Sequence, residues 1–167
     1  KQIPKRNQNV PTHKAAIDLG YINIMTFVDN IGGQPIIVKD QGKGVKSIIQ
    51  YYMKRVKKLQ DMYDSQQQDR KKGQPLKYGR AFKRLRRNKR LKVNNWLHQA
   101  TAFIIDVCEV REIKELIIGY NPTWKQNLQL RKKTTQVFVQ GPFLRIIDLL
   151  TYKAEERGIK VVLQEES

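Results

Sequence analysis

The sequence predicts one α/β domain built on a mixed five-stranded sheet with flanking helices. Two observations predict this class. Short β-branched and aromatic runs occur near both ends of the chain, and apolar residues recur every three or four positions in long stretches between and beside them. The length of 167 residues suits a single compact domain with its own core. We therefore expect strands at the beginning and end of the chain and helices that connect them.

The chain begins with a polar stretch that contains Pro4 and Pro11, so we interpret residues 1–13 as a linker from an upstream region. Residues 14–20, 21–30 and 31–40 then form three runs rich in β-branched and aromatic residues, separated by turns rich in Gly or Asn. This pattern predicts three strands joined as a meander, with a hairpin turn at residues 30–33.

Two helices are expected next. The spacing of apolar residues predicts a helix over residues 45–62, and a polar segment with Gly73 and Pro75 predicts a loop over residues 64–78. Helical periodicity resumes near Gly79 and continues to about Val110. In the second half of that helix the following residues are expected to pack on the core: Trp96, Ala100, Phe103, Ile104, Val107 and Cys108.

The last third of the chain predicts a fourth strand, a helix and a fifth strand. The run Leu116–Ile118 indicates a strand that is buried on both faces and ends at Gly119. Apolar spacing predicts a helix that begins after Pro142 and ends at Gly158, and residues 159–167 predict the last strand. The predicted order along the chain is three strands, a long helical region, a strand, a helix and a strand. This is the order of the ribonuclease H-like fold.

The charge of the chain is concentrated in one region. Lys and Arg total 33 against 15 Asp and Glu, which gives a formal net charge of +18 and a pI of about 10.1. Residues 39–92 hold 19 of the basic residues and 4 of the acidic ones. We interpret residues 44–95 as a basic helical insert that binds nucleic acid, while a solvated helical hairpin is the alternative. The candidate nucleic-acid-binding residues are Lys54, Arg55, Lys57, Lys58, Arg80, Lys83, Arg84, Arg86, Arg87, Lys89 and Arg90.

Asp18 is the first candidate for chemistry. It ends the first predicted strand, has apolar neighbours and is followed closely by Gly20. A carboxylate in such a position needs a cation or hydrogen-bond donors, and a divalent metal ion is one such partner. Two hard cations held by carboxylates from neighbouring strands can hydrolyse a phosphodiester bond. The alternative is a structural Asp that caps a turn.

Several segments resemble the RuvC-like nuclease domain of the TnpB (OrfB) proteins of insertion sequences. These are KAAIDLGYINIMTF at residues 14–27, IIGYNPTWKQN at residues 117–127, and the helix LLTYKAEERG with the strand that follows it. The resemblance covers nearly the whole chain, and residues 14–167 are identified as a RuvC-like domain on this basis. It implies a nuclease guided by a transposon-encoded RNA, with Mg²⁺ or Mn²⁺ as cofactor and with guide RNA and target DNA as partners.

The sequence departs from that family at the end of the fourth strand, where Gly119 stands in place of the usual Glu. The resemblance to a subgroup implies that Glu165 or Glu166 replaces it, so the predicted metal ligands are Asp18 and Glu165. Strand alternation lets only one of the two point toward Asp18, and we favour Glu165. The alternative is that both are solvated charges at a frayed strand end.

The same resemblance implies that a third acidic residue and a structural zinc ribbon lie beyond residue 167. We therefore expect a truncated nuclease domain with little activity of its own. Two further residues are left open. Trp124 and Lys125 are also candidate nucleic-acid-binding residues. Trp124 either stacks on a base or closes its loop onto the core, and His98 packs against a helix or faces phosphate rather than binding metal.

Three function hypotheses follow. The first is a TnpB-like, metal-dependent DNA endonuclease guided by RNA. The second is a catalytically inactive nucleic-acid-binding remnant of the same fold, and the third is a resolvase-like nuclease for branched DNA. A single cysteine excludes an internal disulfide, and no apolar run approaches the roughly 20 residues of a membrane helix. These features predict an intracellular protein, and the resemblance implies a prokaryotic, cytoplasmic protein associated with the nucleoid.

Overall fold

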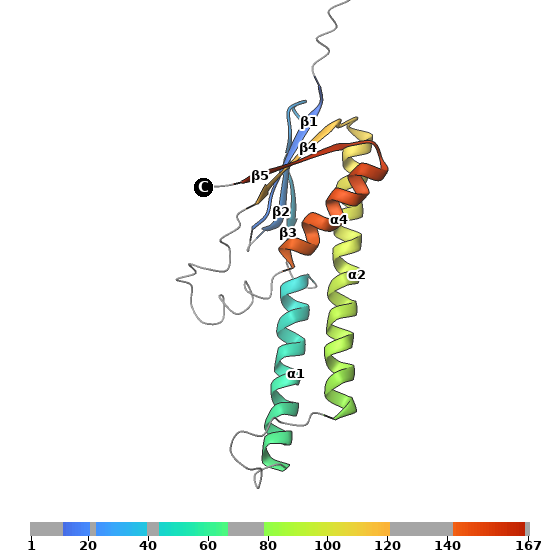
Figure 1. The fold of residues 1–167 in the computed structure, drawn as a ribbon. Coiled ribbons are helices and arrows are strands. Elements are labelled where there is room, and N and C mark those ends of the chain that lie inside the picture. Colours follow the sequence, from blue (N-terminus) through green and yellow to red (C-terminus); the bar gives the residue numbers. More distant parts are fainter. Residues whose placement is uncertain (1–11, 21–22, 40–43, 67–78, 121–141, 166–167) are drawn as a thin grey trace, which may run out of the picture.

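The computed structural model describes residues 12–20, 23–39, 44–66, 79–120 and 142–165 (Figure 1). Their secondary structure follows the order expected from the sequence. The elements are β1 (Lys14–Asp18), β2 (Asn23–Asp29), β3 (Ile36–Lys39), α1 (Val45–Gln66), α2 (Arg80–Val110), β4 (Glu115–Tyr120), α4 (Phe143–Glu156) and β5 (Lys160–Glu165). None of the described helices is both long enough and apolar enough to cross a membrane.

The five strands form one mixed sheet in the order β3-β2-β1-β4-β5. The pairs β1–β2 and β2–β3 are antiparallel, whereas β1–β4 and β4–β5 are parallel. Antiparallel neighbours can be joined by short turns, but each parallel pair needs a helical crossover, which α1 with α2 and then α4 provide. The mixed sheet predicted from the sequence is therefore confirmed.

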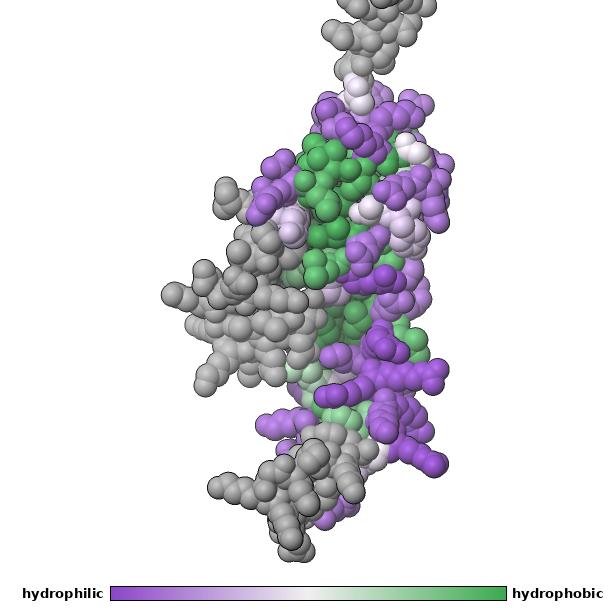
Figure 2. Space-filling model, viewed as in Figure 1, coloured by the Kyte–Doolittle hydropathy of each residue, from purple (hydrophilic) through white to green (hydrophobic). Residues whose placement is uncertain are grey.

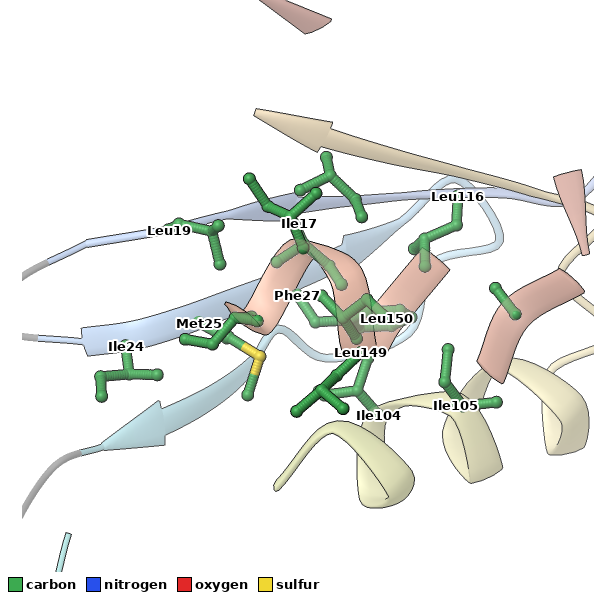
Figure 3. Close-up of a cluster of buried hydrophobic side chains, with 14 of the residues drawn as sticks. Ile17, Leu19, Ile24, Met25, Phe27, Ile104, Ile105, Leu116, Leu149 and Leu150 are labelled. Atoms are coloured by element: carbon green, nitrogen blue, oxygen red, sulfur yellow. The ribbon is translucent and has the colours of Figure 1, made fainter. Parts of the chain in front are cut away.

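Helices α2 and α4 cover one face of the sheet, and the core lies between these layers (Figures 1 and 3). Alternate residues of β1 point into it, because Ala15, Ile17 and Leu19 are all buried. Figure 3 shows strand residues such as Ile17 on the side of the sheet that faces Leu150 of α4. Burying one such aliphatic side chain stabilises the fold by roughly 1.5–3 kcal/mol.

The turn between β2 and β3 is held by one buried carboxylate. The side chain of Asp29 is 0% exposed, and its Oδ1 atom accepts hydrogen bonds from the backbone N–H groups of Ile31 (3.1 Å) and Gly33 (3.0 Å). Its Oδ2 atom pairs with the guanidinium of Arg111, just after α2. Gly32 has φ of 85°, a left-handed conformation that suits Gly. The hairpin turn predicted at residues 30–33 is confirmed, and it is tied to α2.

Helices α1 and α2 lie side by side and extend away from the sheet (Figure 1). We call α1 together with the first half of α2, from Arg80 to Lys92, the hairpin. The start of α1 belongs to the core, since Val45 and Ile49 are buried there. Farther out, Phe82 of α2 is only 2% exposed, and a Cβ atom on Gly79 would lie 2.2 Å from the hydroxyl oxygen of Tyr63. The far end of the hairpin is therefore closely packed as well.

Several sequence-based predictions needed correction. Helix α1 continues to Gln66, so the first residues of the predicted loop at 64–78 are helical, and residues 67–78 lie outside the described part. Phe103 is 50% exposed, whereas the other predicted core residues of α2 do pack on the core: Ile104 and Cys108 are buried, and Trp96, Ala100 and Val107 are partly buried against it. Strand β4 extends to Tyr120, one residue beyond the predicted end.

The prediction that β4 is buried on both faces was also wrong for the described structure. Leu116 and Ile118 are fully buried, but Ile117 between them is only half-buried. The reason is that α2 and α4 both pack against the face to which Leu116 and Ile118 belong. On the other face, Val28 and Ile37 are each more than 40% exposed, so no described helix covers it.

Candidate functional site

Asp18 stands at the edge of the sheet where the parallel strands end. Strands β1, β4 and β5 run in the same direction, so their last residues Asp18, Tyr120 and Glu165 share one edge. In sheets of this kind, ligands bind outside the carboxyl ends of the strands. Asp18 is exposed, and its β2 neighbour is Thr26. The carboxylate is therefore accessible at the edge where ligands are expected.

Asp18 belongs to the face of the sheet that the described helices leave open. Its neighbour Ile17 is 1% exposed and pairs with Phe27 and Ile118, which are also fully buried. Since successive side chains of a strand point to opposite faces, Asp18 points away from the core. Because Asp18 is exposed to solvent, its carboxylate does not carry the free-energy cost of burial and does not require a cation or hydrogen-bond donor from the protein.

The local backbone keeps Asp18 at the start of a tight connection. The N–H of Gly20 donates a hydrogen bond to the carbonyl of Asn23 at 3.1 Å. A Cβ atom on Gly20 would lie 2.9 Å from that same oxygen, which is closer than real side chains approach. The close approach of β2 to β1 therefore explains why position 20, two residues after Asp18, is a glycine.

The strand register does not bring Glu165 to the face of Asp18. Ile17 pairs with Ile118, which pairs with Leu163, so the next row consists of Asp18, Gly119 and Gln164. Glu165 pairs with Tyr120 one row later and thus falls on the opposite face by alternation. The register argues against our preference for Glu165. Glu166, the other candidate, lies outside the described residues, and the catalytic role of either Glu stays a prediction.

A complete metal site is not formed within the described part of the chain. Among those residues, no group of three or more His, Cys, Asp or Glu side chains could hold a metal ion. Asp18 supplies one exposed carboxylate, and oxygen ligands of this type suit Mg²⁺ and Mn²⁺. The donor set at this edge therefore fits one ligand of a divalent ion and needs others from elsewhere.

The hairpin carries the predicted basic residues on its surface. All of them are exposed except Lys89, which is half-buried. Those on α1 are Lys54, Arg55, Lys57 and Lys58, and those on α2 are Arg80, Lys83, Arg84, Arg86, Arg87, Lys89 and Arg90. Figure 2 shows hydrophilic residues gathered over the part of the view where the first half of α2 lies. The sequence-predicted binding residues thus share one structural element.

Positive charges lie close together on this surface, and they affect the pKa of Lys89. Burial lowers the pKa of Lys89, and the nearby positive charge of Arg86 lowers it further. Arg86 also lies over the ring of Phe82, with Cζ 4.8 Å from the ring centroid. On α1, Arg55 donates a hydrogen bond of 2.6 Å to the hydroxyl oxygen of Tyr51. Aromatic and hydroxyl groups, rather than carboxylates, position these two guanidinium groups.

Ion pairs between described residues are found at the sheet end of the molecule. They join Lys14 and Lys160 to Glu115, Arg111 to Asp29, and Arg157 to Asp106 and Glu109. Sequence reasoning missed the pair of Arg111 and Asp29, which are 82 positions apart and leave no local signal. Of the other candidates, Trp124 and Lys125 lie outside the described residues.

A known sequence family matches most of the chain. The family OrfB_IS605, described as "Probable transposase", matches residues 2–125. The chain belongs to this family. The resemblance to TnpB (OrfB) proteins inferred from the sequence is thereby confirmed. No curated protein sequence matches it significantly.

Solved structures share the fold of the OrfB_IS605 chain. One is a chain of the Cas12f1–sgRNA–target DNA complex, with a TM-score of 0.61 and 10% sequence identity. Another is a chain of a CRISPR–Cas12f ternary complex, with a TM-score of 0.63 and 12% identity. These matches cover 99% of this chain but only 37% and 31% of those chains. The chain spans about a third of their length and has the predicted ribonuclease H-like, RuvC-like fold.

Proposed function

We propose that this chain is the RuvC-like part of an RNA-guided, metal-dependent DNA endonuclease of the TnpB kind. Its hairpin binds the phosphate backbones of guide RNA and target DNA, and Asp18 is one carboxylate of the metal site. Family membership and the fold of the Cas12f chains support the assignment. Because function depends on the site rather than the scaffold, the proposal rests mainly on the hairpin and on Asp18.

The observation that carries the proposal is a cationic hairpin attached to a sheet that presents an exposed carboxylate at its ligand edge. Leaving Lys89 aside, the ten other basic candidates of the hairpin form no ion pair with any described carboxylate. Repulsion within such a surface destabilises the free protein and is relieved by a polyanion. A nucleic acid supplies phosphates along a line of comparable length.

The two surfaces have separate tasks in this mechanism. The Lys and Arg side chains of α1 and α2 bind phosphate oxygens and position the nucleic acid without reading its sequence. Asp18 would hold a divalent metal ion through its carboxylate oxygens at the open edge. A bound divalent ion would supply an activated water and stabilise the leaving oxygen. The chain itself contributes positioning, since α2 connects the hairpin directly to the layer under the sheet.

Binding is tested by fluorescence anisotropy with a labelled RNA–DNA hybrid of about 20 base pairs, titrated at several salt concentrations. If the hairpin makes 6–10 phosphate contacts, affinity should fall by about 10³- to 10⁵-fold between about 50 and 200 mM salt. A salt-independent affinity, or no binding, would contradict the assignment of the hairpin.

Catalysis is tested in the full-length protein with Asp18→Asn, which retains the shape of the side chain and removes its charge. We expect cleavage to fall by more than about 10³-fold, because a metal ligand stabilises charge in the transition state. Affinity for the hybrid should stay unchanged, since the hairpin is a different surface. The matched control is Asp61→Asn, which removes an exposed carboxylate from α1. Undiminished cleavage by the Asp18 variant would refute the catalytic part.

A second candidate function is a nucleic-acid-binding remnant without catalysis. Two observations favour it. Gly119 offers no side chain in the row of Asp18, and Glu165 falls on the opposite face. In this case the full-length protein would bind the hybrid with the expected salt dependence but would not cleave it, with or without Mg²⁺ or Mn²⁺. Cleavage that depends on Asp18 would exclude this candidate.

A further inference from the structure

Helix α4 lies along the second half of α2 and places three cationic side chains against it. From the beginning of α4 to its end these are Arg145, Lys153 and Arg157. Arg145 meets α2 at Asn94, Lys153 meets it at His98 and Thr101, and Arg157 meets it at Asp106 and Glu109. The two helices therefore run in the same direction, and each cation has a defined partner.

The partners differ in charge along this contact. Arg157 is paired with the carboxylates of Asp106, at 3.4 Å, and Glu109. Arg145, in contrast, donates from Nε to the neutral amide oxygen of Asn94 at 3.5 Å. No described carboxylate lies within ion-pair distance of it. The Nη groups of Arg145 make no hydrogen bond to a described residue, so they remain available for an anion.

Lys153 is also held by neutral acceptors. Its Nζ atom donates to the carbonyl oxygen of His98 at 2.7 Å and to Oγ1 of Thr101 at 2.9 Å. These bonds use two of the three ammonium protons and fix the direction of the third. Burial lowers the pKa of Lys153, which the carboxylates of Asp106 and Glu156 oppose from a longer distance. An ammonium group desolvated in this way gains from a further anionic partner.

The imidazole of His98 lies within the field of both cations. Burial lowers its pKa first, and the charges of Lys153 and Arg145 lower it further. Arg145 contacts α2 at Asn94 and Lys153 contacts it at Thr101, and His98 lies between these two positions along α2. No described carboxylate lies within ion-pair distance of Arg145 or Lys153.

We propose that Arg145, Lys153 and His98 form a phosphodiester-binding site that extends the basic surface of the hairpin toward the sheet. The inference rests on the proposed function, because it assigns a further contact to the same nucleic acid. Arg87 supports continuity, since it is exposed and lies two helical turns before Asn94 on the same line of α2, about 10 Å away. The backbone bound by the hairpin would thereby be led toward the edge that carries Asp18.

The experiment compares Arg145→Gln with Arg157→Gln in the complete chain. Both variants remove one positive charge from α4, but only Arg157 has its charge neutralised by carboxylates. The probe is a fluorescein-labelled RNA–DNA hybrid of about 20 base pairs, with a DNA duplex of equal length as the second arm. We expect Arg145→Gln to weaken binding of the hybrid by about 3- to 10-fold and to reduce the salt slope by about one. Arg157→Gln should bind as the wild type does.

A second readout follows His98 directly. The chain has two histidines, His13 and His98, so their ring signals in NMR spectra can be separated by substitution. Adding the hybrid should shift the ring signals of His98 in the wild type and leave those of His13 in place. Lys153→Met tests the remaining cation, with thermal unfolding as the check that α4 still packs on α2.

The outcomes separate this inference from the proposed function. If the wild type binds but Arg145→Gln binds equally well and the His98 signals do not move, the site is refuted and the hairpin assignment survives. Equal weakening by Arg145→Gln and Arg157→Gln would also refute it, because net charge alone would then explain the effect. If the wild type binds neither probe, the proposed function fails, and this site fails with it.

Discussion

The two halves of helix α2 differ in whether their charged side chains are paired with opposite charges. The first half, from Arg80 to Lys92, is basic and largely exposed, and apart from Lys89 none of its cations lies within ion-pair distance of a described carboxylate. The second half carries Asp106 and Glu109, both paired with Arg157, and ends beside the pair of Arg111 and Asp29. One continuous helix is therefore neutralised by ion pairs at the sheet end, and we propose that an external polyanion neutralises the hairpin end.

The largest effect should come from removing charge at the hairpin end. Replacing Arg80, Lys83, Arg84 and Arg87 by Gln should weaken binding of an RNA–DNA hybrid by about 10²- to 10³-fold and lower the salt slope by about 3–4. Thermal stability should hold or rise, because like charges repel in the free protein. The control neutralises the paired cations Lys14, Arg157 and Lys160, and anisotropy should then detect little change in affinity.

Substitutions that remove apolar contacts should lower stability more at the sheet end of the molecule than on the exposed surface of the hairpin. Leu149 of α4 is 0% exposed in the core, so Leu149→Ala should lower the free energy of unfolding by about 2–5 kcal/mol. Leu91, on the hairpin half of α2, is 52% exposed, and Leu91→Ala should cost less than about 0.5 kcal/mol. Urea denaturation followed by circular dichroism measures both. Equal costs would mean that the side chain of Leu91 is buried in solution and would contradict its exposed position.

The buried carboxylate at the sheet end predicts a dependence on pH. Burial raises the pKa of Asp29, but hydrogen bonds from Gly33, Arg111 and Ile31 outweigh it and hold the pKa below its ordinary value. Ionised Asp29 therefore stabilises the fold above about pH 4, and this contribution is lost as the pH falls through the folded-state pKa. Asp29→Asn should lower the thermal midpoint near neutral pH, and its difference from the wild type should shrink below about pH 4. A difference that is constant with pH would contradict this account.

The smallest effect is expected for an exposed ion pair. Arg157 and its partners Asp106 and Glu109 are all more than 40% exposed at their side chains. Solvent screens such pairs, so Arg157→Gln should change the free energy of unfolding by no more than about 1 kcal/mol. The same denaturation measurement checks it. A larger loss would show that Arg157 fixes the position of α4 on α2.

Elements with strong periodicity could be predicted from the sequence, and contacts between distant elements could not. The strand order and the helix of residues 80–110 followed from repeated apolar spacing, and the basic candidates of the hairpin other than half-buried Lys89 proved to be exposed together. Phe103 was misplaced because it lies at the margin of the apolar stripe, whose centre runs through Leu97, Thr101, Ile104 and Cys108. The face of Glu165 depends on the register between β4 and β5, which only the paired strands reveal.

The continuity of α2 has a mechanical consequence. The helix has 31 residues and is therefore about 46 Å long, with its second half fixed between α4 and the sheet. Its outer end at Arg80 lies about 25 Å beyond Leu97, where the helix enters the core. A rotation of about 10° at that point would move the outer end by about 4 Å, which is close to the 3.4 Å rise of one base pair. Engagement of a duplex by the outer end would thus act as a lever on the layer beneath Asp18.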